Sequence, residues 1–397
     1  MRIQKFSPKF LIYAIALSVC HGIPGFIPLL PTFQQEYNLN SYEVSNCLAY
    51  FSYSAFIGTP ITGYLYTKFP KRFFIFIVNF IFFAALLGIA VSPNYASLLF
   101  FRVIQGFGSS AMNLLIFLLP AEYYSGLERA KTMGRAIGSI AIGLFITPLV
   151  TGYLALYSWR YSVFSLSIPS FFTLILIFYT DLTEKFTKSN TPFTFTQVKQ
   201  VITAPYILVL LFALFVCAGI DLSVPSLFSL FSAETYNYSS STIGIIYAFS
   251  NFGMFIGSSY LLAMLLRTKH FPLLLFIAGL CVAILLISFT KLPTFMFFIA
   301  FFVFFCLDGI LNPYLNYSIS NGVPTALLTI GITISATFFR AGQGFVTAFF
   351  AYLSNIIGYN LTYILMGTVY FIIIVLLIPY VHKQQKRGRM PPEKRGL

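Results

Sequence analysis

Long apolar stretches alternate with short polar segments along almost the whole chain. The stretches are continuous and about 20 to 27 residues long, and roughly 20 apolar residues let a helix cross a hydrocarbon layer about 30 Å thick. A membrane β-barrel would instead show alternating strands of about ten residues. The pattern therefore predicts an all-α membrane protein with twelve membrane-spanning helices. We place them at residues 9–31, 45–67, 72–91, 96–119, 133–155, 161–180, 205–231, 240–265, 270–289, 294–316, 327–353 and 358–381.

The longest polar segment, residues 181–204, divides these predicted spans into two sets of six. We therefore expect an N-terminal six-helix half at 1–180, a cytoplasmic linker at 181–204, a C-terminal six-helix half at 205–382 and a basic cytoplasmic tail at 383–397. Two such halves are typical of transporters built from structural repeats, whose substrate site lies near the membrane midplane between the repeats. This organisation favours a transporter.

Basic residues are distributed unevenly between the two sides of the predicted bundle. Of the 24 Lys and Arg residues, 20 lie in segments on the same side as the N-terminus. Cytoplasmic loops of membrane proteins carry such an excess, so we expect both termini and the linker in the cytoplasm. The expected location is a cell membrane, either a bacterial inner membrane or a plasma membrane.

The amino-acid composition agrees with a membrane protein and argues against nucleic acid as a partner. The chain is 58% apolar and 9% charged, whereas soluble domains carry about a quarter charged residues. Its net charge of +14 follows from the loop bias and from attraction to anionic lipid, so nucleic acid is not expected as a partner. The five cysteines lie in or beside the apolar stretches without a C-x-x-C pair, as packing residues do.

The sequence lacks the motifs of ATP-driven pumps and of membrane-embedded zinc hydrolases. It has no G-x-x-x-x-G-K-[ST] phosphate loop and no H-E-x-x-H motif. We therefore expect no enzymatic activity, no cofactor and no metal. Any active transport must draw its energy from an ion gradient.

Residues 63–72, which read GYLYTKFPKR, resemble the G-x-L-A-D-R-x-G-R-R signature of the major facilitator superfamily. The positions that match in residue or charge are Gly63, Lys68, Lys71 and Arg72. Thr67 replaces the aspartate of the signature and Pro70 replaces its second glycine. We expect Glu122, at the cytoplasmic end of the fourth span, to pair with Lys71 or Arg72 as a gating or structural charge.

Two further stretches carry the same resemblance. Residues 102–108, RVIQGFG, are similar to the R-x-x-Q-G-x-G signature of the family, and residues 143–152 resemble the G-x-x-x-G-P-x-x-G-G signature of its antiporters. Key positions that match in the second stretch are Gly143, Pro148 and Gly152. The resemblance implies the major facilitator fold, alternating access and the drug/proton antiporter branch. Small residues at this spacing are also suited to a rigid helix seam, so both interpretations of the stretch stay open.

Ionisable residues inside predicted spans are costly in lipid and commonly functional. Here they are His21, Arg102, Asp221, Asp308 and Arg340. Asp221 and Asp308 are candidates for proton coupling, and His21 joins them because an imidazole titrates near neutral pH. In the family the first, fourth, seventh and tenth spans line the central cavity, and each of those spans has one of these residues. Because the Asp and Arg charges sum to zero, a structural ion pair, above all between Asp308 and Arg340, is the alternative.

Polar residues share helix faces with these charges, at about 100° per residue. Such faces must contact protein or water rather than lipid. The candidates for substrate binding or coupling are Arg102, Gln105, Asn113, Asn251, Asn312 and Arg340.

Together these features predict a secondary transporter that exports a small amphipathic compound or metabolite in exchange for protons. A proton-coupled symporter or a facilitator for a polar or anionic metabolite, suggested by Arg102 and Arg340, is the alternative among transporters. A non-transporting membrane receptor or scaffold is the alternative of another class. The expected partners are the small-molecule substrate, protons and membrane lipid, and the chain is expected to act as a monomer.

Overall fold

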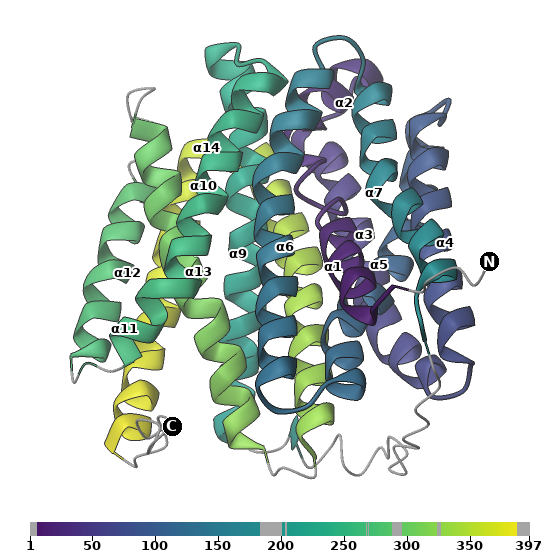
Figure 1. Ribbon diagram of the computed structural model, residues 1–397. Helices are drawn as coiled ribbons and strands as arrows, with labels where there is room; N and C mark the ends of the chain where they lie inside the picture. Colours follow the sequence, from purple (N-terminus) through teal and green to yellow (C-terminus); the bar gives the residue numbers. More distant parts are fainter. Residues whose placement is uncertain are drawn as a thin grey trace. The chain divides into compact units, whose positions relative to one another are not determined.

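The computed structural model describes residues 6–182, 201–202, 205–266, 268, 270–287, 296–323 and 327–386. Within these residues the chain is almost entirely helical, as Figure 1 shows. The helices gather into two compact units. Unit 1 comprises Met1–Phe193 and Pro225–Ala248, and unit 2 comprises Thr194–Val224 and Phe249–Leu397.

Unit 1 is built on the helices of the N-terminal part of the chain. They are α1 (Pro8–Val19), η1 (Ile27–Leu29), α2 (Leu30–Tyr37), α3 (Ser41–Tyr66), α4 (Lys71–Ala90), α5 (Tyr95–Tyr123), α6 (Gly126–Leu154) and α7 (Trp159–Tyr179). Helix α5 packs against α1, α3 and α4, and α7 packs against α1, α4 and α6. An isolated bridge between Phe6 and Thr180 joins the two ends of this set of helices.

Unit 2 holds most of the remaining helices. In chain order these are α9 (Pro205–Tyr236), α10 (Ser240–Ile256), the π-helical stretch η2 (Gly257–Leu261), α11 (Leu262–Leu266), α12 (Phe271–Ile287), α13 (Met296–Gly322) and α14 (Leu328–Lys386). Helices α9 and α10 contribute to both units, because the boundaries fall after Val224 and after Ala248. Helix α14 packs against α12 and α13.

Seven helices in the described part of the chain are long and apolar enough to cross a membrane. Their mean hydropathy follows from the same apolar runs that define the predicted spans, so α4, α5 and α7 lie within a few residues of the expected bounds. The predicted spans 327–353 and 358–381 both fall in α14, whose backbone departs from helical geometry at Gly358, with φ 76° and ψ 166°. Glycine adopts this left-handed φ without a Cβ clash.

The first predicted span is not the continuous helix expected over 9–31. Helix α1 ends at Val19, and turns follow until η1 begins at Ile27. The intervening HGIPGF sequence explains the break, because proline removes a backbone donor and glycine adds backbone freedom. The N–H of Phe26 bonds the carbonyl of Ile23 in a short turn, at 2.9 Å. The eighth span, predicted at 240–265, is also divided by the π-helical η2.

The predicted linker lies almost wholly outside the described residues. So do residues 387–397 of the predicted tail. The boundaries expected for the two halves, the linker and the tail therefore stay predictions.

Candidate functional site

A fully buried guanidinium group lies in unit 1, on α5. Arg102 exposes none of its surface. Its Nε donates to the carbonyl of Cys47 on α3 at 2.7 Å, and Nη1 donates to the carbonyl of Gly22 at 2.6 Å. Nη1 also donates to Oε1 of Gln105, one turn along α5, at 2.6 Å. Within the described residues Arg102 makes no ion pair, so carbonyl and amide oxygens serve in place of a carboxylate.

These contacts fall on the break in the first span. In a continuous helix the Gly22 carbonyl would accept from the N–H of Phe26, but that N–H bonds Ile23 instead. Arg102 satisfies the carbonyl that the break leaves free, and an unpaired buried carbonyl is costly. The Arg102 side chain thus holds the irregular segment after α1 against α3 and α5.

Two aromatic rings and two unused donors complete the surroundings of Arg102. Its guanidinium carbon lies 4.0 Å from the ring centroid of Phe26 and 4.6 Å from that of Phe51, within the range of a cation–π interaction. Nη2 of Arg102 and Nε2 of Gln105 are buried and have no hydrogen-bond partner among the described residues. This site therefore offers two donors to an acceptor such as water or an anionic group.

His21 also lies in the irregular segment after α1. It is 8% exposed, and its Nδ1 donates to the carbonyl of Ser18 at 3.2 Å. The predicted proton-coupling candidate is thus hydrogen-bonded within its own turn.

Two carboxyl groups come together in unit 2. Asp308 on α13 exposes none of its surface, and it lies close enough to Asp221 on α9 for the two carboxyl groups to interact. Nδ2 of Asn312, one turn along α13, donates to Oδ1 of Asp308 at 2.7 Å. Oδ2 of Asp308 and Oδ1 of Asn312 have no partner within the described residues. We call Asp221 and Asp308 the carboxyl pair.

The structural ion pair considered between Asp308 and Arg340 is absent from the described part of the chain. Arg340 donates to Oε1 of Gln343 on its own helix at 2.8 Å, and Asp308 accepts from Asn312 on its own helix. Residues three or four positions apart on a helix are neighbours, so each charge finds a local partner. The carboxyl pair is left without a basic partner among the described residues.

The remaining predicted site residues are distributed over both units. Asn113 in unit 1 donates to the carbonyl of Ser109 at 3.0 Å. Asn251 in unit 2 is 4% exposed. Unit 1 thus contains His21, Arg102, Gln105 and Asn113. Unit 2 contains the other candidates, which are Asp221, Asn251, Asp308, Asn312 and Arg340. No group of three or more His, Cys, Asp or Glu residues suited to a metal occurs within the described ranges.

The first residue of α4, Lys71, makes the contact expected of Glu122. Nζ of Lys71 lies 2.5 Å from Oε2 of Glu122, and the hydroxyl of Tyr66 donates to the same oxygen at 2.9 Å. Arg72 instead donates to the carbonyl of Thr180 at 2.8 Å. Lys68 lies over the ring of Tyr64. The Lys71–Glu122 contact is present as predicted, and a gating role for it stays a prediction.

Replacing Glu122 by Gln should lower stability. The Glu122 and Lys71 side chains are only 17% and 13% exposed, so the glutamine leaves a half-buried ammonium group without its counter-charge, at a cost of about 1 kcal/mol. Thermal unfolding in detergent measures this loss. The control is Glu128→Gln, which breaks the more exposed ion pair with Lys9 and should have a smaller effect. Equal effects of the two substitutions would contradict the role assigned to burial.

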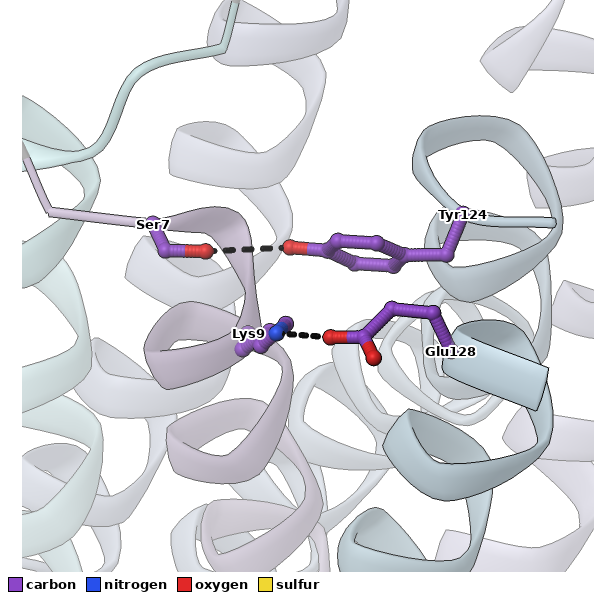
Figure 2. Close-up of polar contacts among 4 residues, drawn as sticks. All are labelled: Ser7, Lys9, Tyr124 and Glu128. Carbon is purple, nitrogen blue, oxygen red and sulfur yellow. Dashed lines mark hydrogen bonds and ion pairs between the residues drawn. The ribbon is translucent and has the colours of Figure 1, made fainter.

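A second polar cluster ties the start of α1 to the connection between α5 and α6, as Figure 2 shows. Lys9 forms an ion pair with Glu128, and the hydroxyls of Ser7 and Tyr124 lie 3.1 Å apart. This cluster could not be predicted from the sequence, because partners more than 100 residues apart leave no local pattern.

Helix α6 makes close contacts at two glycines of its motif, with a side chain at Gly143 and with backbone at Gly152. A Cβ added to Gly143 would lie 2.8 Å from the Cβ of Cys20, and one added to Gly152 would lie 2.5 Å from the carbonyl oxygen of Ser240. Conversely, a Cβ added to Gly244 on α10 would lie 2.3 Å from the carbonyl oxygen of Pro148. These small residues let helix backbones approach each other, which supports the helix-seam interpretation without testing the antiporter one.

The chain is similar in sequence to a quinolone resistance protein and, over a shorter stretch, to a solute carrier. It is 27% identical to the quinolone resistance protein NorA of Staphylococcus aureus (strain MSSA476) over 319 residues, which are 78% of this chain and 80% of that protein. A shorter match, 35% identical over 123 residues, is to solute carrier family 22 member 2 of Mus musculus, and it covers 30% of this chain and 21% of that protein.

Solved structures of transporters share the fold. A bacterial homologue of the human lysosomal transporter Spinster, in an inward-facing and unoccupied conformation, gives a TM-score of 0.75 at 12% identity, covering 97% of this chain and 98% of that one. A D-xylose–proton symporter gives a TM-score of 0.73 at 15% identity, covering 98% and 99%. The family model of the Major Facilitator Superfamily matches residues 10–347. Because this match spans most of the chain, the protein belongs to the Major Facilitator Superfamily, whose members are membrane transporters.

Proposed function

We propose that the protein is a secondary transporter that exports a small amphipathic compound in exchange for protons. The observation that carries this proposal is the carboxyl pair of unit 2, in which Asp308 is fully buried and Asp221 is half-buried. The pair has no basic partner among the described residues. Two carboxyl groups at close range cannot both ionise easily. Such a pair can take up and release a proton during a transport cycle, as acidic residues in membrane pumps and transporters do. The similarity to a quinolone resistance protein supports a drug-like substrate.

The proposal includes an architecture and a set of residue roles. The twelve spans form two six-helix halves, at 1–180 and 205–382, as in transporters built from structural repeats. Both termini and the linker face the cytoplasm. The protein lies in a bacterial inner membrane or a plasma membrane and acts as a monomer. The residues proposed to bind the substrate or couple it to protons, beside the carboxyl pair and His21, are Arg102, Gln105, Asn113, Asn251, Asn312 and Arg340.

A second candidate function is proton-coupled uptake of a polar or anionic metabolite. The unused donors at Nη2 of Arg102 and Nε2 of Gln105 favour it, because a fixed guanidinium binds carboxylates and phosphates well. Arg102 exposes no surface, so a substrate could reach these donors only in another conformation. Export is preferred because of the sequence similarity to a quinolone resistance protein.

Accumulation of compounds in cells that express the protein tests the direction of transport. With a panel of fluorescent amphipathic cations and neutral compounds, we expect lower steady-state accumulation than in cells expressing Asp221→Asn with Asp308→Asn at matched membrane levels. Collapse of the proton gradient should remove the difference. Higher accumulation in wild-type cells would favour uptake instead, and no difference with any compound would contradict export of this substrate class.

A further inference from the structure

A buried tyrosine that no sequence motif singles out lies beside the carboxyl pair. Tyr370 on α14 exposes none of its surface, and its ring centroid lies 5.7 Å from that of Phe304. Phe304 precedes Asp308 by four residues, so the two side chains lie on the same face of α13. Tyr370 also interacts electrostatically with Asp308 and Asp221. The tyrosine therefore packs against α13 one turn before the buried carboxyl group of Asp308.

The hydroxyl group of Tyr370 has no hydrogen-bond partner within the described residues. Oδ2 of Asp308 accepts from no N–H or hydroxyl group among the described residues either, and its neighbour is the carboxyl group of Asp221. A buried hydroxyl without a partner costs free energy. A donor and an acceptor that are both unsatisfied in one cluster are suited to bond each other in a different state of the protein.

Tyr363 provides a direct comparison on the same helix. It lies seven residues, about two turns, before Tyr370 and also exposes no surface. Its hydroxyl donates to the carbonyl of Val224 on α9 at 3.1 Å. Tyr363 thus has the structural bond that Tyr370 lacks, although both side chains come from the same face of α14.

We propose that Tyr370 is a positioning residue of the carboxyl pair, whose hydroxyl donates a hydrogen bond to Asp308 or Asp221 once the pair has released its proton. This inference rests on the proton coupling proposed above. While the pair holds a proton, the two carboxyl groups can share it. After release, the pair carries more negative charge and needs donors, and a hydrogen bond to a charged acceptor is stronger than one to a neutral acceptor. Nδ2 of Asn312 supplies one donor, and Tyr370 supplies a second.

Few other titratable groups face this cluster. In the described part of the chain, the groups that interact with Asp221 of α9 and Asp308 of α13 are Cys217 of α9 and Tyr370 of α14. Helix α12, which packs against α13 and α14, has only the exposed Cys281. The η2 stretch, which packs against α13, has only the exposed Tyr260. Arg340 bonds Gln343 instead. The hydroxyl of Tyr370 is thus the additional donor near the carboxyl pair.

The test compares Tyr370→Phe with Tyr363→Phe in the full-length protein. Infrared spectroscopy of the purified protein in lipid follows the band of protonated carboxyl groups against pH, and the band that disappears in Asp308→Asn identifies the pair. Because a hydrogen bond to the anion favours release of the proton, Tyr370→Phe should move the titration midpoint to higher pH by about one unit, a change of about tenfold in the proton equilibrium. The pH profile of transport should move in the same direction.

Thermal unfolding should distinguish the two variants in the opposite way. Tyr370→Phe removes an unpaired hydroxyl and should unfold at the wild-type temperature or above it, whereas Tyr363→Phe loses a bond and should unfold at a lower temperature with its titration midpoint unchanged. The proposal is overturned if Tyr370→Phe leaves the midpoint in place, if Tyr363→Phe moves it equally, or if Tyr370→Phe fails to fold. If wild-type protein shows no proton-driven flux, the proposed function fails, and the infrared titration still decides the role of Tyr370.

Discussion

Replacing Asp308 by Asn abolishes pH-driven transport and leaves exchange of substrate for substrate in place. Asp308 is fully buried, and its contact with Asn312 is made through one oxygen, Oδ1. Asparagine has nearly the same shape and keeps an acceptor oxygen for this contact, so the helix packing should survive. It cannot take up or release a proton, so a proton gradient can no longer drive net movement, whereas exchange requires no net protonation.

The measurement uses proteoliposomes with a substrate found in the accumulation assay. Gradient-driven flux of Asp308→Asn should fall to that of protein-free liposomes, and exchange should stay close to that of the wild type. The control is Glu36→Gln, which neutralises an exposed carboxylate on α2 and should retain both activities. Full gradient-driven flux in Asp308→Asn and in Asp221→Asn would show that neither acid couples protons.

Replacing Arg102 by Ala costs both stability and transport. The substitution removes the donors to the carbonyls of Gly22 and Cys47 and leaves a cavity between Phe26 and Phe51. Unpaired buried carbonyls and a large cavity together predict a loss of about 3 kcal/mol or more. Because the Gly22 carbonyl lies in the break after α1, we also expect transport to be strongly reduced.

Two further variants separate the charge of Arg102 from its geometry. Arg102→Lys keeps the charge but loses the planar set of five donors, so it should recover only part of the stability and flux. Arg340→Ala is the matched control, since among the described residues that partly exposed guanidinium bonds only Gln343 of its own helix, and it should cost less stability. Thermal unfolding in detergent and flux at matched protein levels measure both effects. Wild-type stability and flux in Arg102→Ala would show that the side chain is dispensable.

Much of the helical layout could be predicted from the sequence because it depends on local apolar runs. The runs that predict α4 and α7 end at polar residues or prolines, so their bounds are within a few residues of the observed ones. Hydropathy alone does not predict the break after α1, because the HGIPGF sequence is apolar overall. A reading of Pro24 and Gly25 as helix-breaking residues could have found it.

The site could be predicted only where its contacts are local or follow a motif. The pair of Arg102 with Gln105 is three residues apart on α5 and lies within the R-x-x-Q-G stretch. The contact of Arg102 with Cys47 and the position of Tyr370 beside Asp308 join residues more than 50 positions apart. The pattern of apolar and polar residues does not predict such contacts, since they depend on how the helices pack.

Flux against a controlled pH gradient in proteoliposomes tests proton-coupled export most directly. Purified protein is reconstituted with an identified substrate, and the gradient is imposed, reversed or omitted at constant membrane potential. We expect the substrate to move against the direction of proton flow and reversal of the gradient to reverse this movement. The Asp221→Asn with Asp308→Asn variant should show neither effect. Substrate movement in the same direction as protons, or equal flux with and without a gradient, would contradict it.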